Sequence, residues 1–192
     1  PLCDALASDY RVLPLTARDL DAAKEEAATR LQQLQPAAVI SIERPGLAED
    51  GRYYNMRGED ITARCYFFDP FLTLATCPTL AIGDGGNEIG MGKIAEAIAT
   101  LDIRVAATGC DELLVADVSN WSAYGLIALL AKWSGRDLLA EISPLDILDY
   151  LSAHGSVDGV TRQNSLTEDG LAASEGIEVI RQLRIMSGFE SD

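Results

Sequence analysis

The sequence predicts an α/β protein with a mostly parallel sheet and helices on both faces, a three-layer α/β/α arrangement. Short apolar runs typical of buried strands alternate along the chain with stretches whose apolar residues recur every three or four positions. The composition, with 48% hydrophobic and 23% charged residues in a chain of 192, is typical of a globular protein. We expect a single domain over residues 1–192, since this length is close to that of one average domain.

The first half of the chain supplies one helix and two strands. Apolar residues at steps of three and four predict an amphipathic helix over residues 19–34, which Pro36 prevents from continuing. The apolar runs at residues 38–42 and 79–82 are predicted as buried strands. These elements give the order helix, strand, strand before the middle of the chain.

The second half continues the alternation. We expect a helix over residues 87–100, strands at 103–107 and 112–118, an apolar helix over 121–133 and a last helix over 175–186. The apolar helix fits either the core or an interface between copies, and the sequence leaves oligomerisation open.

A further helix is predicted near residue 144. Ser143 is suited to the N-cap position and Pro144 to the first turn, and the helix should end at His154-Gly155. The polar, turn-rich residues 155–170 are expected to form a long loop.

Charge and composition exclude several classes of protein. Thirty acids and 15 bases give a net charge of −15, and no Lys/Arg run offers the basic face that nucleic-acid binding requires. No apolar run is long enough for a membrane span, and the first residues lack the layout of a signal peptide. The four cysteines (Cys3, Cys65, Cys77 and Cys110) form no C-x-x-C pair, so we expect reduced thiols and a cytoplasmic protein.

Polar residues follow three of the predicted strands. Glu43-Arg44 comes after the first strand, residues 83–92 after the second, and Ser119-Asn120 after the strand at 112–118. Ligands of open α/β sheets bind beyond the carboxyl ends of the strands. The sequence therefore predicts a small-molecule site built from these three segments.

The segment 83–92 contains five glycines in ten residues but no nucleotide motif. Glu88 stands where G-x-G-x-x-G needs its third glycine, and Ile94 replaces the Ser or Thr of a P-loop. We therefore expect no nucleotide cofactor. Backbone amides of Gly85 and Gly86, with the side chain of Asn87, are candidates for binding a substrate anion. The alternative is a tight turn in which Asp84 or Asn87 caps the following helix.

Asp84, Glu88 and Glu43 are the candidate catalytic residues. A carboxylate in this position can take a proton from a substrate ammonium, or the three can bind Mg²⁺ or Mn²⁺, which prefer oxygen ligands. The sequence leaves both roles open for Asp84.

The polar segment between the first two strands supplies candidate binding residues. Arg57, together with Arg44, can hold a carboxylate, while Asn55 and Asp60 can bind a metal or an amine. The alternative is a surface loop whose arginines pair with the abundant acids.

Five sequence blocks together resemble the D-glutamate cyclase-like C-terminal domain family, over about residues 36–170. The blocks are Ser41–Gly46, Tyr53–Gly58, Ile82–Gly92, Val118–Trp121 and Val157–Thr161. Three features depart from the family pattern: Ser122 replaces a glycine, Glu168 precedes Asp169-Gly170 in place of a valine, and no Thr-Asp-Gly-Pro element precedes Tyr10. The resemblance therefore implies a domain that lacks the family's N-terminal strand unit.

The resemblance implies a lyase that converts D-glutamate to 5-oxo-D-proline and water. Arg44 and Arg57 are then expected to hold carboxylates, and Asp84 or Glu88 to accept the ammonium proton, with Ser119 and Asn120 as further binding residues. The rival interpretations are an enzyme of another phosphorylated or carboxylate metabolite, and a binding or regulatory module without catalysis.

Overall fold

The computed structural model describes residues 11–191, so Cys3 and the segment ahead of Tyr10 lie outside the described residues. The chain divides into two compact units. The N-terminal unit comprises the described residues up to Ala81 together with Gly85–Leu113, and the C-terminal unit comprises Ile82–Asp84 and the chain from Leu114 onward. The single domain over residues 1–192 stays a prediction.

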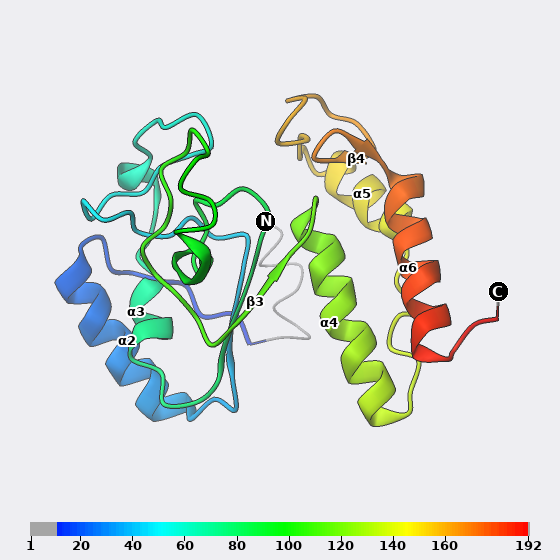
Figure 1. The fold of residues 1–192 in the computed structure, drawn as a ribbon, viewed down its shortest axis with the longest axis horizontal. Helices are drawn as coiled ribbons and strands as arrows, with labels where there is room; N and C mark the ends of the chain where they lie inside the picture. Colours follow the sequence, from blue (N-terminus) through cyan, green and yellow to red (C-terminus); the bar gives the residue numbers. More distant parts are fainter. Residues whose placement is uncertain (1–10, 192) are drawn as a thin grey trace. The chain divides into compact units, whose positions relative to one another are not determined.

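A parallel sheet and its helices confirm the α/β class (Figure 1). The strands β1 (Val39–Ile42), β2 (Thr79–Gly83) and β3 (Glu112–Val115) lie side by side in the order β1-β2-β3. All three coincide with apolar runs in the sequence. β3 ends three residues earlier than predicted, at the point where the chain turns polar.

Two helices cover β1 within the N-terminal unit. Helix α2 (Leu20–Leu34) begins where the Asp19 carboxylate accepts a hydrogen bond from the Ala22 amide at 2.9 Å, as an N-cap does. It packs against the short helix α3 (Asp69–Thr73). Apolar residues from these helices, β1 and the loop after β2 form one core cluster: Ala27, Val39, Phe71, Leu72 and Ile89.

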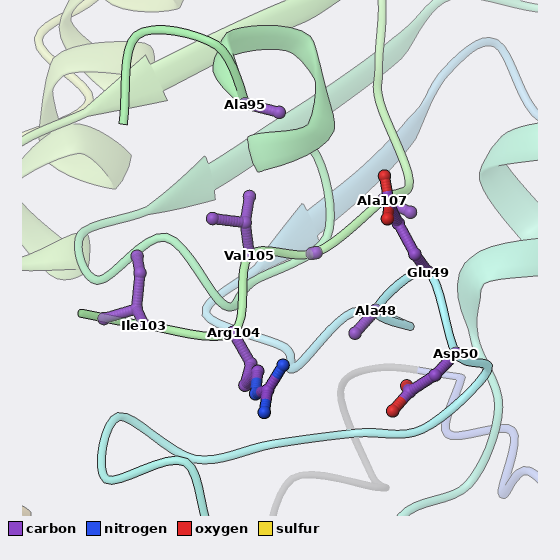
Figure 2. A pocket seen from close by; sticks show the side chains of 9 residues that line it. Ala48, Glu49, Asp50, Ala95, Ile103, Arg104, Val105 and Ala107 are labelled. Atoms are coloured by element: carbon purple, nitrogen blue, oxygen red, sulfur yellow. The ribbon is translucent and has the colours of Figure 1, made fainter. Parts of the chain in front are cut away.

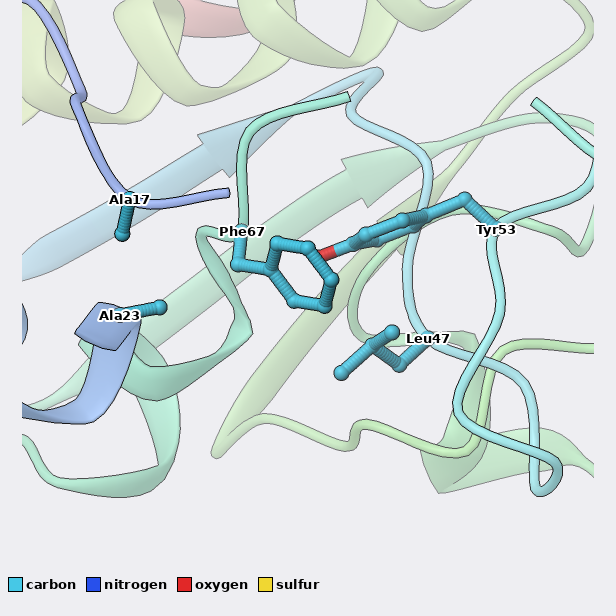
Figure 3. Packing of buried hydrophobic residues seen from close by; sticks show 5 residues of the cluster. All are labelled: Ala17, Ala23, Leu47, Tyr53 and Phe67. Atoms are coloured by element: carbon cyan, nitrogen blue, oxygen red, sulfur yellow. The ribbon is translucent and has the colours of Figure 1, made fainter. Parts of the chain in front are cut away.

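A second cluster fixes the loops that follow β1 (Figure 3). Its buried members are Ala17, Ala23, Leu47, Tyr53 and Phe67. The rings of Tyr53 and Phe67 meet edge to face, with centroids 5.1 Å apart and planes at 69°. The chain around Leu47 and Tyr53 is thereby held against the core, which positions the polar segments on either side.

Two predicted elements in the N-terminal unit are wrong. The helix over 87–100 is replaced by a single 3₁₀ turn, Met91–Ile94, and irregular turns, because Gly90 has a φ of 101° that no helix accommodates. Residues 103–107 form no strand. Their amides bond to loops, from Ala106 to the Gly86 carbonyl at 3.1 Å and from Ala107 to the Leu47 carbonyl at 2.7 Å.

The C-terminal unit is mainly helical. Helices α4 (Ser119–Ser134) and α5 (Pro144–Ala153) both pack on α6 (Ala173–Ser187), around a core of Tyr124, Ala128, Leu139 and Ile180. Ser143 caps α5 as predicted, since its hydroxyl accepts from the Asp146 amide at 3.3 Å. Between α5 and α6, β4 (Thr167–Glu168) and β5 (Leu171–Ala172) form a short antiparallel hairpin.

Within residues 11–191, no helix combines the length and the apolar character that crossing a bilayer requires.

Candidate functional site

The glycine loop (residues 85–92) is held by a carboxylate of its own. The Glu88 side chain accepts hydrogen bonds from the amides of Gly85 at 3.0 Å and Gly86 at 2.7 Å, and Glu88 is only 5% exposed. These are the two amides that the sequence suggested for binding a substrate anion. Here an internal carboxylate occupies that position, so the loop is shaped by Glu88.

Two glycines of this loop are closely packed by side chains. A Cβ on Gly85 would collide with the Met56 sulfur, and one on Gly86 would collide with the end of the Ile103 side chain. Gly86 also has a φ of 104°, which favours glycine. Met56 and Ile103 therefore lie directly against the loop, although they come from distant parts of the sequence.

The segment after β1 pairs with the glycine loop, as the strand-end argument predicted. The Gly46 amide donates to the Asn87 carbonyl and the Ile89 amide donates to the Arg44 carbonyl, both at 2.8 Å. Gly46 is needed here because a Cβ would lie 2.9 Å from the Ile89 nitrogen. Two of the three predicted segments thus meet within the N-terminal unit.

Arg44 and Glu43 lie at the end of β1. The Arg44 guanidinium donates to the Tyr66 carbonyl at 3.1 Å and lies 5.1 Å from the Phe68 ring. Its Nε is buried and has no hydrogen-bond partner among the described residues, so this donor is available to a ligand. Glu43 is exposed and has a left-handed backbone, with φ 49°.

Asn87 carries a second unsatisfied polar atom. Its Nδ2 donates to the Tyr54 carbonyl at 2.8 Å, while its Oδ1 is buried without a partner in residues 11–191. The Asn87 side chain is 7% exposed as a whole. A buried acceptor without a donor is costly, and a ligand N–H would remove that cost.

Asn55 shapes its own turn. Its Oδ1 accepts from the amides of Arg57 at 2.9 Å and Glu59 at 3.0 Å, and its Nδ2 donates to the Glu59 carboxylate at 2.6 Å. Asp60, the other candidate in this segment, caps Thr62 and pairs with Arg52 at 3.3 Å. Arg57, by contrast, has no hydrogen bond or ion pair from its side chain among the described residues.

Two pockets lie beside the glycine loop, and both are lined by Ile103 and Arg104. One, of about 340 Å³, also contains Arg57 and Asp102. The other, of about 310 Å³, is lined by Glu49, Asp50 and small apolar residues (Figure 2). In Figure 2 the Arg104 side chain points away from those of Ile103 and Val105, as alternate residues of extended backbone do.

Asp69 is a buried carboxylate that the sequence did not single out. It is 3% exposed and accepts hydrogen bonds from the Leu47 amide at 2.9 Å, the Tyr53 hydroxyl at 2.6 Å and the Thr108 hydroxyl at 2.5 Å. Burial and the Asp69 charge raise the pKa of Tyr53 far above its ordinary value. Asp69 therefore joins the loops around the pockets to α3.

In the C-terminal unit, Asp84 meets the N-terminus of α4. Its Oδ2 accepts from the Ser119 amide and from the Ser119 hydroxyl, both at 3.2 Å. The amide is one of the free donors that begin every helix. Within residues 11–191, Oδ1 of Asp84 has no protein donor, so one oxygen of this half-buried carboxylate is available for a proton.

Asp169 lies close to Asp84, with carboxylate oxygens within 4.8 Å of each other. Burial, and then the charges of Asp84, Asp158 and Glu168, raise the pKa of Asp169 above its ordinary value. The backbone of Asp169 is left-handed, with φ 49°. A neighbouring carboxylate that retains its proton to higher pH can act as a proton donor beside Asp84.

Asn120, predicted to bind substrate, contacts another acid. Its Nδ2 donates to Glu168 at 2.9 Å, and the Trp121 ring nitrogen donates to the second oxygen of the same carboxylate at 3.1 Å. Glu168 is buried, and α6 approaches it so closely that only glycine fits at Gly176. These bonds fix β4 to the start of α4.

Asp158 organises the loop between α5 and α6. Its carboxylate accepts from the amides of Val160, Thr161 and Gly170 and from the Thr167 hydroxyl, at 2.7 to 2.9 Å. Burial alone would raise the pKa of Asp158, but these hydrogen bonds outweigh burial and hold the pKa far below its ordinary value.

Asp158→Asn is expected to lower the free energy of unfolding by about 2 kcal/mol at neutral pH, because donors now face an amide. The contribution of a carboxylate with a lowered pKa is complete above about pH 4 and is lost as the pH falls below that. Urea unfolding at a series of pH values should therefore show a shallower acid loss of stability in the variant. Asp149→Asn, at an exposed position of α5, is the control, and equal acid slopes for wild type and Asp158→Asn would contradict this role.

Besides Asp69, the sequence reasoning missed Asp102, Arg104 and Asp169. Asp102 and Arg104 lie on either side of Ile103, at the start of the predicted strand 103–107, and Asp169 lies in the predicted loop 155–170. The available signal in the first case was a pair of opposite charges separated by one apolar residue. For Asp169, the only signal was the acid pair Glu168-Asp169 beside a glycine.

Comparison with known proteins gives two matches. Residues 4–184 match the family described as D-glutamate cyclase-like, C-terminal. The chain is also 38% identical over 103 residues to the mitochondrial D-glutamate cyclase of Homo sapiens, a match that covers 48% of this chain and 16% of the human protein.

Proposed function

Because this chain belongs to the D-glutamate cyclase-like, C-terminal family, we propose that it is a lyase that converts D-glutamate to 5-oxo-D-proline and water. The observation that carries the proposal is the Asp84 carboxylate, which has one oxygen held by Ser119 and the other without a protein donor in the described chain. Asp84 directly precedes the glycine loop in the sequence, within one of the five blocks that resemble the family.

The chemistry is an intramolecular condensation. The α-ammonium loses a proton, the neutral nitrogen attacks the γ-carboxyl carbon, and the new C–N bond forms as a C–O bond breaks. Both protons lost by nitrogen leave with the departing oxygen as water. Nucleophile and electrophile belong to one molecule, so orientation supplies much of the rate enhancement and no covalent enzyme intermediate is needed.

The residues divide into three roles in this proposal. In the C-terminal unit, Asp84 is the candidate general base for the ammonium proton. In the N-terminal unit, Arg44, whose Nε has no partner among the described residues, and Arg57 are the candidates for binding carboxylate, and Oδ1 of Asn87 is the candidate acceptor for an N–H group. Gly85, Gly86 and Glu88 shape the loop, because their polar groups are bonded to one another.

A metal ion is the alternative role for the acids. The oxygens of Asp84 and Asp169 suit Mn²⁺ or Mg²⁺, which would act as a Lewis acid on the leaving oxygen. Glu88, suggested by the sequence as a ligand, accepts hydrogen bonds from the loop amides of Gly85 and Gly86 with its two carboxylate oxygens. Glu43 stays a candidate ligand predicted from the sequence.

Incubation of the protein with D- and L-glutamate, followed by chiral mass spectrometry of 5-oxoproline, tests the proposal. We expect product from D-glutamate above a heat-denatured blank, because glutamate also cyclises slowly by itself. Parallel reactions with EDTA and with added Mn²⁺ distinguish the roles of Asp84. Activity that survives EDTA supports a base, and activity that EDTA removes and Mn²⁺ restores supports a metal ligand. Equal product in sample and blank contradicts the cyclase proposal.

A further inference from the structure

Two arginines, Arg57 and Arg104, line the pocket of about 340 Å³. The charge of Arg104 helps to lower the pKa of Asp50, which lines the neighbouring pocket. Neither guanidinium has a hydrogen bond or ion pair within the described part of the chain, although acids outnumber bases by 30 to 15. In so acidic a protein, arginines on the surface are expected to pair with carboxylates. Two arginines without such a bond that line one pocket therefore point to an anion from outside the chain.

Tyr54 holds Arg104 in this position. The Arg104 guanidinium lies 5.7 Å from the centre of the Tyr54 ring. The Tyr54 hydroxyl donates to Asp50 at 2.6 Å, and its carbonyl accepts from Asn87. Arg104 is therefore supported by a residue that is itself bonded to the glycine loop.

The walls of the pocket also contact the glycine loop. Met56 lies over Gly85, on the side where the unsatisfied Asn87 Oδ1 also lies, and Ile103 lies over Gly86. A ligand that enters beside Met56 thus comes close to the one buried acceptor of the loop that lacks a donor among residues 11–191.

The charge of the pocket selects the kind of anion. Asp102 lines the same pocket and has no bonded partner in residues 11–191, so the charged residues of the lining, two arginines and one acid, sum to a net charge of about +1. Asp50, outside this lining, also acts on Arg104. The net charge of the lining balances one carboxylate. A phosphate group, with its higher charge, would instead be repelled by Asp102.

We infer that Arg57 and Arg104 together bind the non-reacting α-carboxylate of a dicarboxylate substrate, and that Asp102 excludes phosphorylated compounds. This inference rests on the proposed function, and it adds Arg104 and Asp102 to the residues that determine which substrate is bound. Holding the α-carboxylate leaves the amine and the γ-carboxyl group free to react.

Titration calorimetry with glutarate, a dicarboxylate that has no amine and cannot cyclise, tests the pocket without turnover. Arg104→Gln and Arg57→Gln are each expected to raise the Kd for glutarate about tenfold or more. Arg52→Gln is the matched control, since Arg52 is an exposed arginine of the same segment that pairs with Asp60. It should leave the Kd unchanged. Far-UV circular dichroism verifies that each variant is folded.

The phosphate affinity of Asp102→Asn distinguishes a role of Asp102 in selecting the anion from a purely structural role. Removal of one negative charge should make inorganic phosphate bind about fivefold more tightly than it binds wild type. Unchanged phosphate binding would overturn the role of Asp102.

Kinetics with D-glutamate separates this inference from the cyclase proposal. Arg104→Gln should raise KM about tenfold while kcat changes little, since the α-carboxylate does not react. If both arginine variants form product with a normal KM and bind glutarate with normal affinity, the role of this pocket in binding the α-carboxylate is contradicted. The cyclase proposal is then unaffected. Glutarate binding that depends on both arginines, without 5-oxoproline from D-glutamate, supports the pocket and contradicts the cyclase proposal.

Discussion

Replacement of Asp84 by Asn is expected to lower kcat for 5-oxoproline formation about 100-fold or more, the usual loss when a general base is removed. An amide of the same shape still accepts from the Ser119 amide and hydroxyl through its oxygen, so α4 keeps its contact. It cannot take a proton from the substrate ammonium. Steady-state kinetics with D-glutamate, with product measured by mass spectrometry, gives kcat and KM separately.

Two further variants serve as comparisons for the kcat of Asp84→Asn. Ser119→Ala removes one of the two donors to Asp84 and should reduce kcat less than Asp84→Asn, because the backbone amide remains. Asp149→Asn, at an exposed position, should have wild-type kinetics. If Asp84→Asn turns over D-glutamate at the wild-type rate, Asp84 is not the base.

Gly90→Ala is expected to cost about 3 kcal/mol or more in the free energy of unfolding, because two penalties act together. Its φ of 101° strains any residue with a Cβ, and that Cβ would collide with the Cβ of Ala81, which is fully buried in β2. Urea unfolding followed by far-UV circular dichroism measures the change.

Matched glycines separate the two penalties. Gly51 has a φ of 75° but open space where a Cβ would stand, so Gly51→Ala should cost only about 1 kcal/mol. Gly125 lies within α4 with no such constraint, and Gly125→Ala should stabilise the protein by about 0.5 kcal/mol. Equal losses for Gly90→Ala and Gly51→Ala would show that the contact with Ala81 is unimportant.

The elements that the sequence predicted well carry their own local signals. Asp19 caps α2, Ser143 and Pro144 begin α5, and mostly apolar runs form β1 and β2. Each signal acts over a few residues and needs no knowledge of the rest of the fold.

The failures occurred where distant segments decide the conformation. The apolar spacing of residues 87–100 is compatible with a helix, but Gly90 must be left-handed to pack on Ala81, and the helix is lost. Residues 103–107 are mostly apolar, yet the amides of Ala106 and Ala107 bond to the carbonyls of Gly86 and Leu47 instead of to a strand. Propensity cannot reveal a partner that lies elsewhere in the chain.

The site residues stay a prediction. The structure does bring together the backbone segments that contain Arg44 and Asn87, as expected for the strand ends of a parallel sheet. The sequence could not show that the amides of Gly85 and Gly86 are taken by Glu88, or that Asn55 is occupied by its own turn. Hydrogen-bond partners of this kind are a matter of side-chain direction, which spacing alone does not determine.

The hydrogen bonds from the loop amides to Glu88 affect how much binding free energy is lost when a ligand binds to the glycine loop. A loop whose amides wait for a ligand must be ordered by that ligand, and part of the binding free energy is lost in the ordering. Here the ordering is complete before any ligand arrives, since Glu88 supplies the negative charge that the amides attract. The loop is therefore already ordered when a flexible substrate binds to it. The conformational entropy lost on binding is then mainly that of the substrate.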